Sequence, residues 1–138
     1  MAGTIDMQAM RHLNLFNKIT RISTRFCFNY NNTIFFCVPR NMLSRAIGEN
    51  GSNIKKMNEV LRRKIKVIAS PRGIEDAKRF IESIVSPVTF RDLTINGNEI
   101  TISAGTQSKA ALIGRDKRRL LELQNIAKDF FGKELRII

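Results

Sequence analysis

Histidine and cysteine are scarce in this chain of 138 residues, which has one histidine, His12, and two cysteines, Cys27 and Cys37. A structural zinc site takes four Cys or His ligands, and catalysis by a serine or cysteine nucleophile relies on a neighbouring histidine. We expect His12 on a helix surface, and both cysteines as buried free thiols because they lie in apolar runs that are predicted strands. The sequence therefore predicts no metal, no cofactor and no enzymatic activity.

Long apolar runs are also missing, since no stretch approaches the roughly 18 apolar residues that cross a membrane. The N-terminal segment MAGTIDMQAM lacks the charged and long apolar regions of a signal peptide. Neither a Walker-type G-K-[ST] motif nor a dinucleotide-binding G-x-G-x-x-G motif is present. We therefore expect a soluble cytoplasmic protein with no membrane partner and no small-molecule substrate.

Acidic residues are half as numerous as basic ones, and this imbalance is the first positive signal. The 24 Lys and Arg residues against 12 Asp and Glu give a net charge of +12 and a sequence pI near 10.5. Such a surplus on a short chain favours a polyanionic partner, nucleic acid first, over a solvated basic surface with no partner. Residues 1–70 hold 12 basic and 3 acidic residues, and residues 71–138 hold 12 and 9, so the net charges are +9 and +3.

An internal repeat organises the chain, with Ile47-Gly48-Glu49-Asn50 and Ile113-Gly114-Arg115-Asp116 lying 66 residues apart. Ahead of each copy, apolar residues at helical spacing predict an amphipathic helix. The two apolar faces consist of Ile5, Ala9, Leu13 and Phe16, and of Ile74, Ala77, Phe80, Ile81 and Ile84. Acids suit the first turns of these helices, and they are Asp6, Glu75 and Asp76.

Two β-rich runs follow each predicted helix and are joined by residues that tolerate tight turns, so we expect two β-hairpins. The runs are residues 21–30 and 33–38 around Asn31-Asn32, and residues 88–95 and 99–103 around Asn96-Gly97-Asn98. Each hairpin leads into a short helix, at 41–47 and 107–113, that ends at a glycine.

A second helix and a closing strand complete each copy. The apolar stripes of the two helices are Ile54, Met57 and Val60 or Leu61, and Leu120, Leu123, Ala127 and Phe130 or Phe131. Closing strands are expected at 64–69 and 134–138. Ser70-Pro71-Arg72-Gly73 holds the one Pro and Gly cluster between the copies, so we predict two domains, 1–70 and 71–138.

The loop Gly48-Glu49-Asn50-Gly51 between two predicted helices carries the candidate chemistry. Glycines at both ends allow a sharp turn and close backbone approach to a partner, and the next helix presents free N–H groups to a phosphate. Arg45, just before the loop, and Lys55 and Lys56, one turn after it, could reach the same phosphates. A glycine pair at this spacing also marks many ordinary helix caps, so the motif alone is weak evidence.

The loop and its setting resemble the G-x-x-G loop of KH domains, which clamps the backbone of single-stranded nucleic acid. The segment that carries the resemblance is Ala46-Ile47-Gly48-Glu49-Asn50-Gly51-Ser52-Asn53-Ile54. Two such units with a short linker are similar to the archaeal form of the transcription factor NusA over nearly the whole chain. Pro71-Arg72-Gly73-Ile74-Glu75-Asp76-Ala77 and Ser108-Lys109-Ala110-Ala111-Leu112-Ile113-Gly114 strengthen the likeness.

This resemblance implies an α+β fold of two tandem type II KH domains, each a three-stranded mixed sheet packed by helices. The hairpin strands would pair antiparallel, and a right-handed crossover would return the last strand parallel to its neighbour. It also implies binding of single-stranded RNA, the nascent transcript, in transcription elongation or termination. RNA polymerase is a possible second partner, although 138 residues leave no room for the polymerase-binding domain of bacterial NusA. The alternative is a KH scaffold protein of the ribosome or of ribonucleoprotein assembly.

Both loops depart from the KH pattern. Glu49 places an acid in a loop that would face phosphate, and Lys117 stands where the second loop should close with glycine. The second unit is then either an RNA-binding unit with side-chain contacts or a mainly structural one. The predicted RNA-binding residues are Arg45, Ile47, Gly48, Glu49, Asn50, Gly51, Lys55, Lys56, Gly114, Arg115, Lys117 and Arg118.

Aromatic residues on the first hairpin have two interpretations. Phe26, Phe28, Tyr30, Phe35 and Phe36 could stack on unpaired bases. Aromatic side chains on hairpin strands more often pack against helices, and we expect packing here.

Overall fold

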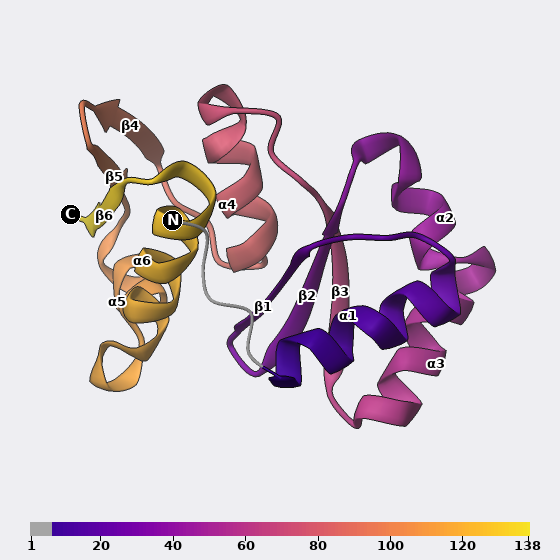
Figure 1. Ribbon diagram of the computed structural model, residues 1–138. Coiled ribbons are helices and arrows are strands. Elements are labelled where there is room, and N and C mark those ends of the chain that lie inside the picture. The colour runs from indigo at the N-terminus through magenta and orange to yellow at the C-terminus, as the bar shows by residue number, and fades with distance from the viewer. Residues whose placement is uncertain (1–6) are drawn as a thin grey trace. The chain divides into compact units, whose positions relative to one another are not determined.

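The computed structural model describes residues 7–138, in which the chain divides into two units between Ser70 and Pro71. The first unit is residues 7–70 and the second unit is residues 71–138. Ile5 and Asp6, which the sequence assigns to the first helix, lie outside the described residues. Figure 1 labels the elements of both units.

Helices and strands follow one another in the same order in the two units. The first unit contains α1 (Met7–Thr20), β1 (Phe26–Tyr30), β2 (Thr33–Val38), η1 (Arg40–Met42), α2 (Leu43–Ile47), η2 (Glu49–Gly51), α3 (Ser52–Leu61) and β3 (Lys64–Ala69). The second contains η3 (Ile74–Asp76), α4 (Ala77–Val85), β4 (Asp92–Asn96), β5 (Glu99–Ser103), α5 (Thr106–Ile113), η4 (Arg115–Lys117), α6 (Arg118–Phe131) and β6 (Glu134–Ile137).

Each unit has one three-stranded mixed sheet, in which the second strand of the unit lies between the first and the third. In the first, β1 pairs antiparallel with β2, and β3 pairs parallel with β2. In the second, β4 pairs antiparallel with β5, and β6 pairs parallel with β5. The expected α+β class and mixed sheets are confirmed, as are the bounds of β2, β3 and β5.

Two predicted strands begin too early. Residues 21–25 are not part of β1, because Arg21 ends α1 in the left-handed region at φ 63° and donates its N–H to the Asn17 carbonyl at 2.8 Å. Residues 88–91 are not part of β4, because the Val88 N–H turns back to the Val85 carbonyl at 3.0 Å. In both places a turn that closes the preceding helix uses residues whose β-propensity suggested a strand.

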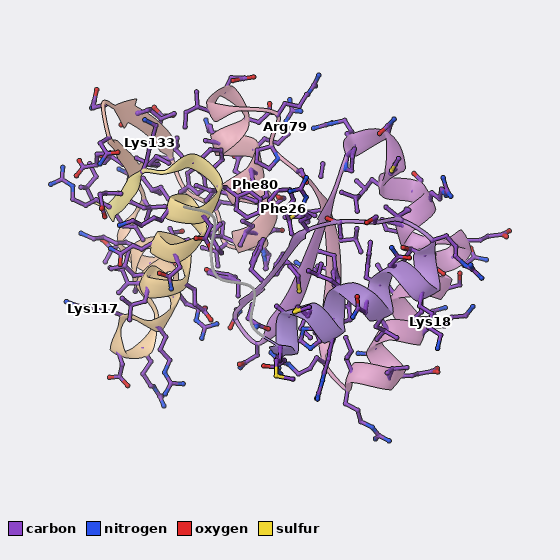
Figure 2. The ribbon with its side chains drawn as sticks, in the orientation of Figure 1. Lys18, Phe26, Arg79, Phe80, Lys117 and Lys133 are labelled. Carbon is purple, nitrogen blue, oxygen red and sulfur yellow. The ribbon has the colours of Figure 1, made fainter. Side chains whose placement is uncertain are left out.

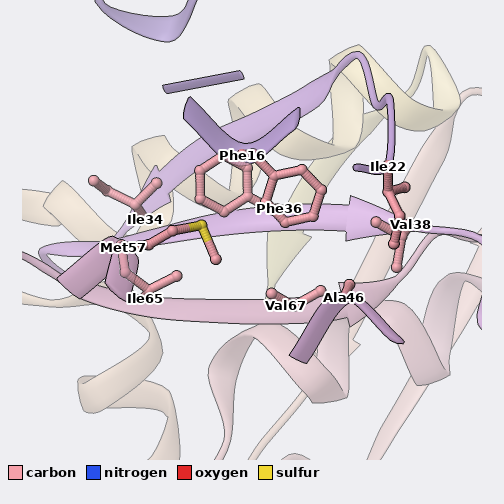
Figure 3. Packing of buried hydrophobic residues seen from close by; sticks show 9 residues of the cluster. All are labelled: Phe16, Ile22, Ile34, Phe36, Val38, Ala46, Met57, Ile65 and Val67. Atoms are coloured by element: carbon pink, nitrogen blue, oxygen red, sulfur yellow. The ribbon is translucent and has the colours of Figure 1, made fainter. Parts of the chain in front are cut away.

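The core of the first unit lies between the helices and one face of its sheet (Figure 3). Phe16 of α1 stacks on Phe36 of β2, with ring centroids 4.6 Å apart, and Met57 of α3 is fully buried. Each such side chain contributes about 1.5–3 kcal/mol by leaving water. The cluster comprises Phe16, Ile22, Ile34, Phe36, Val38, Ala46, Met57, Ile65 and Val67. Ala46 and Met57 belong to the two helices that flank the glycine loop, so the core fixes both sides of that loop.

The core of the second unit has the same plan. Phe80 of α4 lies against Phe130 of α6 with ring centroids 4.7 Å apart. The buried residues of the sheet and helices include Ala77, Ile81, Ile84, Ile100, Ile102, Leu112, Leu123, Ala127 and Leu135. The predicted apolar faces of α4 and α6 are therefore confirmed, except at Ile74, which is 37% exposed.

Three expectations about side chains need correction or completion. His12 is buried, with 7% exposure, because it lies one helical turn from Phe16 on the face of α1 that packs on the sheet, and its Nδ1 is 4.0 Å from the Cys27 sulfur. Val60 is 61% exposed, and Leu61 instead continues the apolar stripe of α3. Neither cysteine forms a disulfide, and Cys37 is buried whereas Cys27 is half-buried.

Candidate nucleic-acid interface

The first loop joins α2 to α3 through a backbone that only glycine adopts readily at its first position. Gly48 has φ 83° and ψ 164°, a region essentially restricted to glycine. A Cβ atom there would lie 2.7 Å from Ser52 Oγ and 2.9 Å from the Asn53 backbone nitrogen. The first glycine is therefore required twice, by its torsion angles and by the close approach of α3.

The closing glycine of the loop is required less strictly. Gly51 has φ 72° and ψ 21°, in the left-handed region, and a Cβ atom there would meet nothing within 4 Å. A non-glycine residue would cost about 1–2 kcal/mol for this conformation, but it would not collide with anything. Side-chain volume is thus excluded at Gly48 and tolerated at Gly51.

The second loop has the same conformation in spite of its lysine. Gly114 has φ 75° and ψ 173°, and its Cβ would lie 2.6 Å from Arg119 Cγ. Asp116 (φ 56°, ψ 27°) matches Asn50 (φ 56°, ψ 28°), and Lys117 takes the left-handed torsions φ 61° and ψ 23°. Lys117 therefore occupies the one loop position where a side chain fits, and the loop that departs from the G-x-x-G pattern keeps its backbone.

Backbone donors are concentrated at the two exposed residues of each loop. In the first, the turn closes when the Gly51 N–H donates to the Gly48 carbonyl at 3.1 Å, and the Ser52 N–H donates to the Glu49 carbonyl. The N–H groups of Glu49 and Asn50 precede these bonds and have no acceptor within the turn. Both residues are exposed, so their N–H groups are available to a phosphate.

Asn53 holds the first loop in shape. Its side-chain Nδ2 donates to the carbonyls of Arg45 and Ala46, each at 3.2 Å, which ties the first turn of α3 to the end of α2. Asn53 carries no sequence signal that marks this role. At the corresponding position of the second unit, Arg119 forms an ion pair with Glu122 at 3.1 Å and packs next to Gly114.

The basic residues predicted around the first loop are at its surface. Arg45, Lys55 and Lys56 are all exposed, and Arg45 immediately precedes the buried Ala46 that anchors α2. Ile47 is half-buried and packs against the core cluster, which ties the end of α2 to the core. Glu49 is exposed, which leaves its carboxylate in solvent rather than beside a basic partner.

The basic residues of the second loop are equally exposed. Arg115 and Lys117 belong to η4, and Arg118 is the first residue of α6. Lys117 lies at the periphery of its unit in Figure 2. The structure thus gathers all twelve predicted residues at two helix-loop-helix turns.

Ion pairs distinguish the two units. The five salt bridges among the described residues all lie in the second unit: Arg72 to Asp76, Lys78 to Asp92, Arg119 to Glu122, Lys128 to Glu134 and Arg136 to Glu99. Glu49 and Glu59 are the acids in the described part of the first unit, and neither pairs with a Lys or Arg there. The positive charge of the first unit is therefore not neutralised within its described residues.

The aromatic residues of the first hairpin pack as expected. Phe28 stacks on Phe35 with ring centroids 5.1 Å apart, and Tyr30 meets Phe35 edge-on at 6.4 Å. Phe35 is 1% exposed and Phe36 belongs to the core, whereas Phe26 is 43% exposed. The packing interpretation is confirmed for Phe35 and Phe36.

The described residues contain neither a cluster of metal ligands nor a membrane-spanning helix. No group of three or more His, Cys, Asp or Glu side chains is placed to hold a metal ion in residues 7–138. Within the same residues, no helix combines the length and apolar character needed to cross a membrane.

The class of fold follows from this geometry: an α+β chain with two three-stranded mixed sheets and a KH-like order of elements in each unit. No protein-family model matches the chain. A solved structure described as "Crystal structure of APE1850" shares the fold, with a TM-score of 0.68, 24% sequence identity, and coverage of 97% of this chain and 99% of that chain.

Two archaeal relatives make the comparison more specific. The chain is 27% identical over 133 residues to the "Probable transcription termination protein NusA" of Halococcus morrhuae, covering 90% of this chain and 94% of the relative. It is 21% identical over 133 residues to the protein of the same name from Thermoplasma acidophilum, covering 94% of this chain and 90% of the relative. The resemblance to archaeal NusA expected from the sequence is confirmed by these two relatives.

Proposed function

We propose that this chain binds single-stranded RNA through its glycine loops and acts on the nascent transcript in transcription termination or elongation. Its two units would be type II KH domains, with the domain limits 1–70 and 71–138. The observation that carries the proposal is the first loop, whose glycine-restricted backbone lies at the surface between three exposed basic side chains that have no ion-pair partner among the described residues.

The first loop offers backbone N–H groups to a phosphate. The Glu49 and Asn50 N–H groups precede the hydrogen bonds of the turn. Gly51 leaves open space where a Cβ would stand, and Gly48 lets α3 pack closely behind the loop. Arg45, on the helix before the loop, adds a charge-assisted contact from the other side. These groups recognise phosphodiester backbone without reading sequence, so they position a strand rather than specify it.

A single strand fits this surface better than a duplex does. A loop that approaches a few consecutive phosphates needs a backbone that bends around it, and the bases of a single strand are free to turn toward protein. Duplex DNA presents a stiff cylinder, which one protruding turn meets at few phosphates. We therefore expect tighter binding to single-stranded RNA than to duplex DNA of equal length.

A role in transcription rests on the two relatives named as probable transcription termination proteins. Those names describe the relatives, and we transfer the role to this chain as part of the proposal. Direct contact with RNA polymerase is a second element of it. Recovery of the tagged chain with RNA polymerase and nascent transcripts would support the role, whereas recovery with ribosomal particles alone would contradict it.

The RNA-binding part of the proposal is tested by salt dependence and one loop variant. Affinity for single-stranded RNA is measured by fluorescence anisotropy between about 50 and 200 mM salt, where each neutralised phosphate contributes about 0.7 to the logarithmic slope. The variant combines Glu49→Asp with Asn50→Asp, which places two short acids on the exposed turn. We expect a steep slope for the native chain and at least about tenfold weaker binding for the variant.

Asn14→Asp is the matched control, because it lowers the net charge by one, as the loop variant does, at an exposed position of α1. It should bind RNA nearly as tightly as the native chain. A flat salt response, or equal losses for the loop variant and the control while circular dichroism shows both folded, would contradict a phosphate-binding loop.

A further inference from the structure

We propose that three consecutive basic residues at the other end of α3, Arg62, Arg63 and Lys64, form a second phosphate-binding surface for the RNA strand held by the first loop. We call these residues the α3–β3 cluster. The proposal rests on the proposed function of the loop and extends it along the surface of the first unit.

The α3–β3 cluster lies one helix length from the loop (Figure 1). Helix α3 begins directly after Gly51 and has ten residues, which span about 15 Å at about 1.5 Å per residue. A KH loop holds about four nucleotides, and at most about four or five more cover the remaining distance, because about 3.4 Å per nucleotide is the spacing of a stacked strand and an unstacked strand is longer. A strand of about ten nucleotides therefore reaches from the loop to the cluster.

Two of the three residues of the cluster are exposed, and none has an acidic partner in the described structure. Arg62 and Lys64 are exposed, and Arg63 donates from Nη2 to Asn29 Oδ1 at 3.2 Å. Asn58 Nδ2 donates to the Arg63 carbonyl at 2.7 Å, which fixes the chain between α3 and β3. The cluster is thus a rigid junction with two outward cations.

The same junction in the second unit does not offer its cations to a ligand in this way. Lys133 Nζ donates to the Gly97 carbonyl at 2.6 Å, and Lys128 pairs with Glu134 at 3.6 Å. The sequence there reads Gly132-Lys133-Glu134 in place of Arg62-Arg63-Lys64. A strongly basic junction is therefore a feature of the first unit.

The contrast between Arg62 and its counterpart in the second unit supports the proposal. Arg62 has φ 55° and ψ 35°, and its N–H bonds to the Asn58 carbonyl at 2.8 Å, as a left-handed helix cap does. The second unit has Gly132 at this place, with φ 64° and ψ 30°, and with open space where a Cβ would stand. Glycine is the favoured residue for such a cap. Arginine at this position lowers stability, and a phosphate contact by its side chain explains why it is present.

The position of Glu59 allows a test of the path that the RNA takes along α3. Glu59 is exposed, and its spacing from Lys55 and Arg62 places the three on one side of α3. A strand that crosses this side passes an acid between two cations. Glu59→Gln should therefore tighten the binding of long RNA two- to fivefold and leave short RNA unchanged.

The principal test combines Arg62→Gly and Lys64→Gln in the full chain. RNA of about four nucleotides should bind with unchanged affinity, whereas RNA of about ten nucleotides should bind about tenfold more weakly, with a logarithmic salt slope lower by about 1.4. Arg62→Gly alone should raise the urea midpoint of the first unit, because glycine relieves the left-handed strain. Gain of stability with loss of long-RNA affinity is a combination that misfolding cannot produce.

Arg79→Gln with Arg91→Gln is the control, since both residues are exposed in the second unit and the charge change is the same. Equal losses in the cluster variant and this control, or native affinity of the cluster variant for long RNA, would overturn the inference. Failure of the proposed loop function would give a different result. In that case the Glu49 and Asn50 variant would bind short RNA normally, whereas failure of the cluster proposal concerns long RNA only.

Discussion

Gly51 and Lys117 close the two loops at nearly the same torsion angles, φ 72° and 61°, and this pair separates what the fold requires from what the surface can vary. The first position of each loop admits only glycine, because a Cβ would strike the following helix. The closing position is open and tolerates lysine at a cost in conformational energy. A loop can therefore lose half of its sequence signature and keep its backbone.

Charge compensation separates the units more clearly than loop geometry does. Five of the twelve Lys and Arg residues of the second unit form ion pairs, whereas the described basic residues of the first unit have no acidic partner. Exposed pairs stabilise a fold by only about 0–1 kcal/mol each, so their main effect is on the surface field. The first unit therefore presents the stronger attraction for a polyanion.

Replacing the first glycine of either loop should have the largest effect on stability. Gly48→Ala and Gly114→Ala each combine left-handed strain with a collision, and we expect a loss of about 2–4 kcal/mol in the free energy of unfolding. Gly51→Ala, which meets open space, should cost about 1 kcal/mol. Urea unfolding followed by the fluorescence of Tyr30, the one tyrosine of the chain, monitors Gly48→Ala and Gly51→Ala in the first unit. Far-UV circular dichroism follows Gly114→Ala in the second unit. Equal losses for Gly48→Ala and Gly51→Ala would contradict the steric distinction.

Alkaline pH should destabilise the first unit and spare the second, which has no cysteine. Burial, and secondly the neighbouring Cys27, raise the pKa of the Cys37 thiol far above its usual range. The folded state then keeps a proton that the unfolded state releases above about pH 8.5, so stability is complete below that pH and falls above it by about 1.4 kcal/mol per unit.

Urea unfolding of the first unit between about pH 7 and 9.5, followed by far-UV circular dichroism, measures this loss. Cys37→Ala should flatten the dependence, and Cys27→Ala should retain most of it. A slope that survives Cys37→Ala would assign the effect to another group.

Exchanging the closing residues of the loops should give the smallest change in stability. Lys117→Gly should stabilise the second unit, and Gly51→Lys should destabilise the first, each by about 1 kcal/mol, because one removes and the other introduces left-handed strain at an open position. Far-UV circular dichroism during urea unfolding of the full chain follows both transitions. Loss of structure in Gly51→Lys would mean that the first loop depends on its second glycine in a way that its geometry does not indicate.

Much of the fold could be predicted from the sequence because independent local signals agreed. The Asn-Asn and Asn-Gly turns, the β-branched and aromatic runs, and the repeat itself located β2, β3 and β5 at their observed bounds. The short helices before each loop were located within one or two residues. The position of each of these elements is determined by residues that are close together in the sequence, so the sequence alone locates it.

The rest depended on backbone conformation and packing that composition does not reveal. Arg21 and Arg62 end helices in the left-handed region, where glycine or asparagine would be expected. Lys117 replaces the closing glycine of the second loop, so the sequence did not predict that this loop has the same backbone conformation as the first. His12 was assigned to a surface because it is polar, although it shares a face with Phe16. Arg62 and Gly132 are at matching places of the two copies, and this difference in the sequence is a signal of the α3–β3 cluster.

Binding of single-stranded RNA by full-length loop variants tests the central claim, that the first loop is the main phosphate contact, most directly. Glu49→Asp with Asn50→Asp in the first loop and Arg115→Gln in the second each lower the net charge by one, so the comparison isolates position from charge. Affinities measured at one salt concentration should fall at least about tenfold for the first variant and less than about threefold for the second. A larger loss for Arg115→Gln, with both variants folded, would contradict the account.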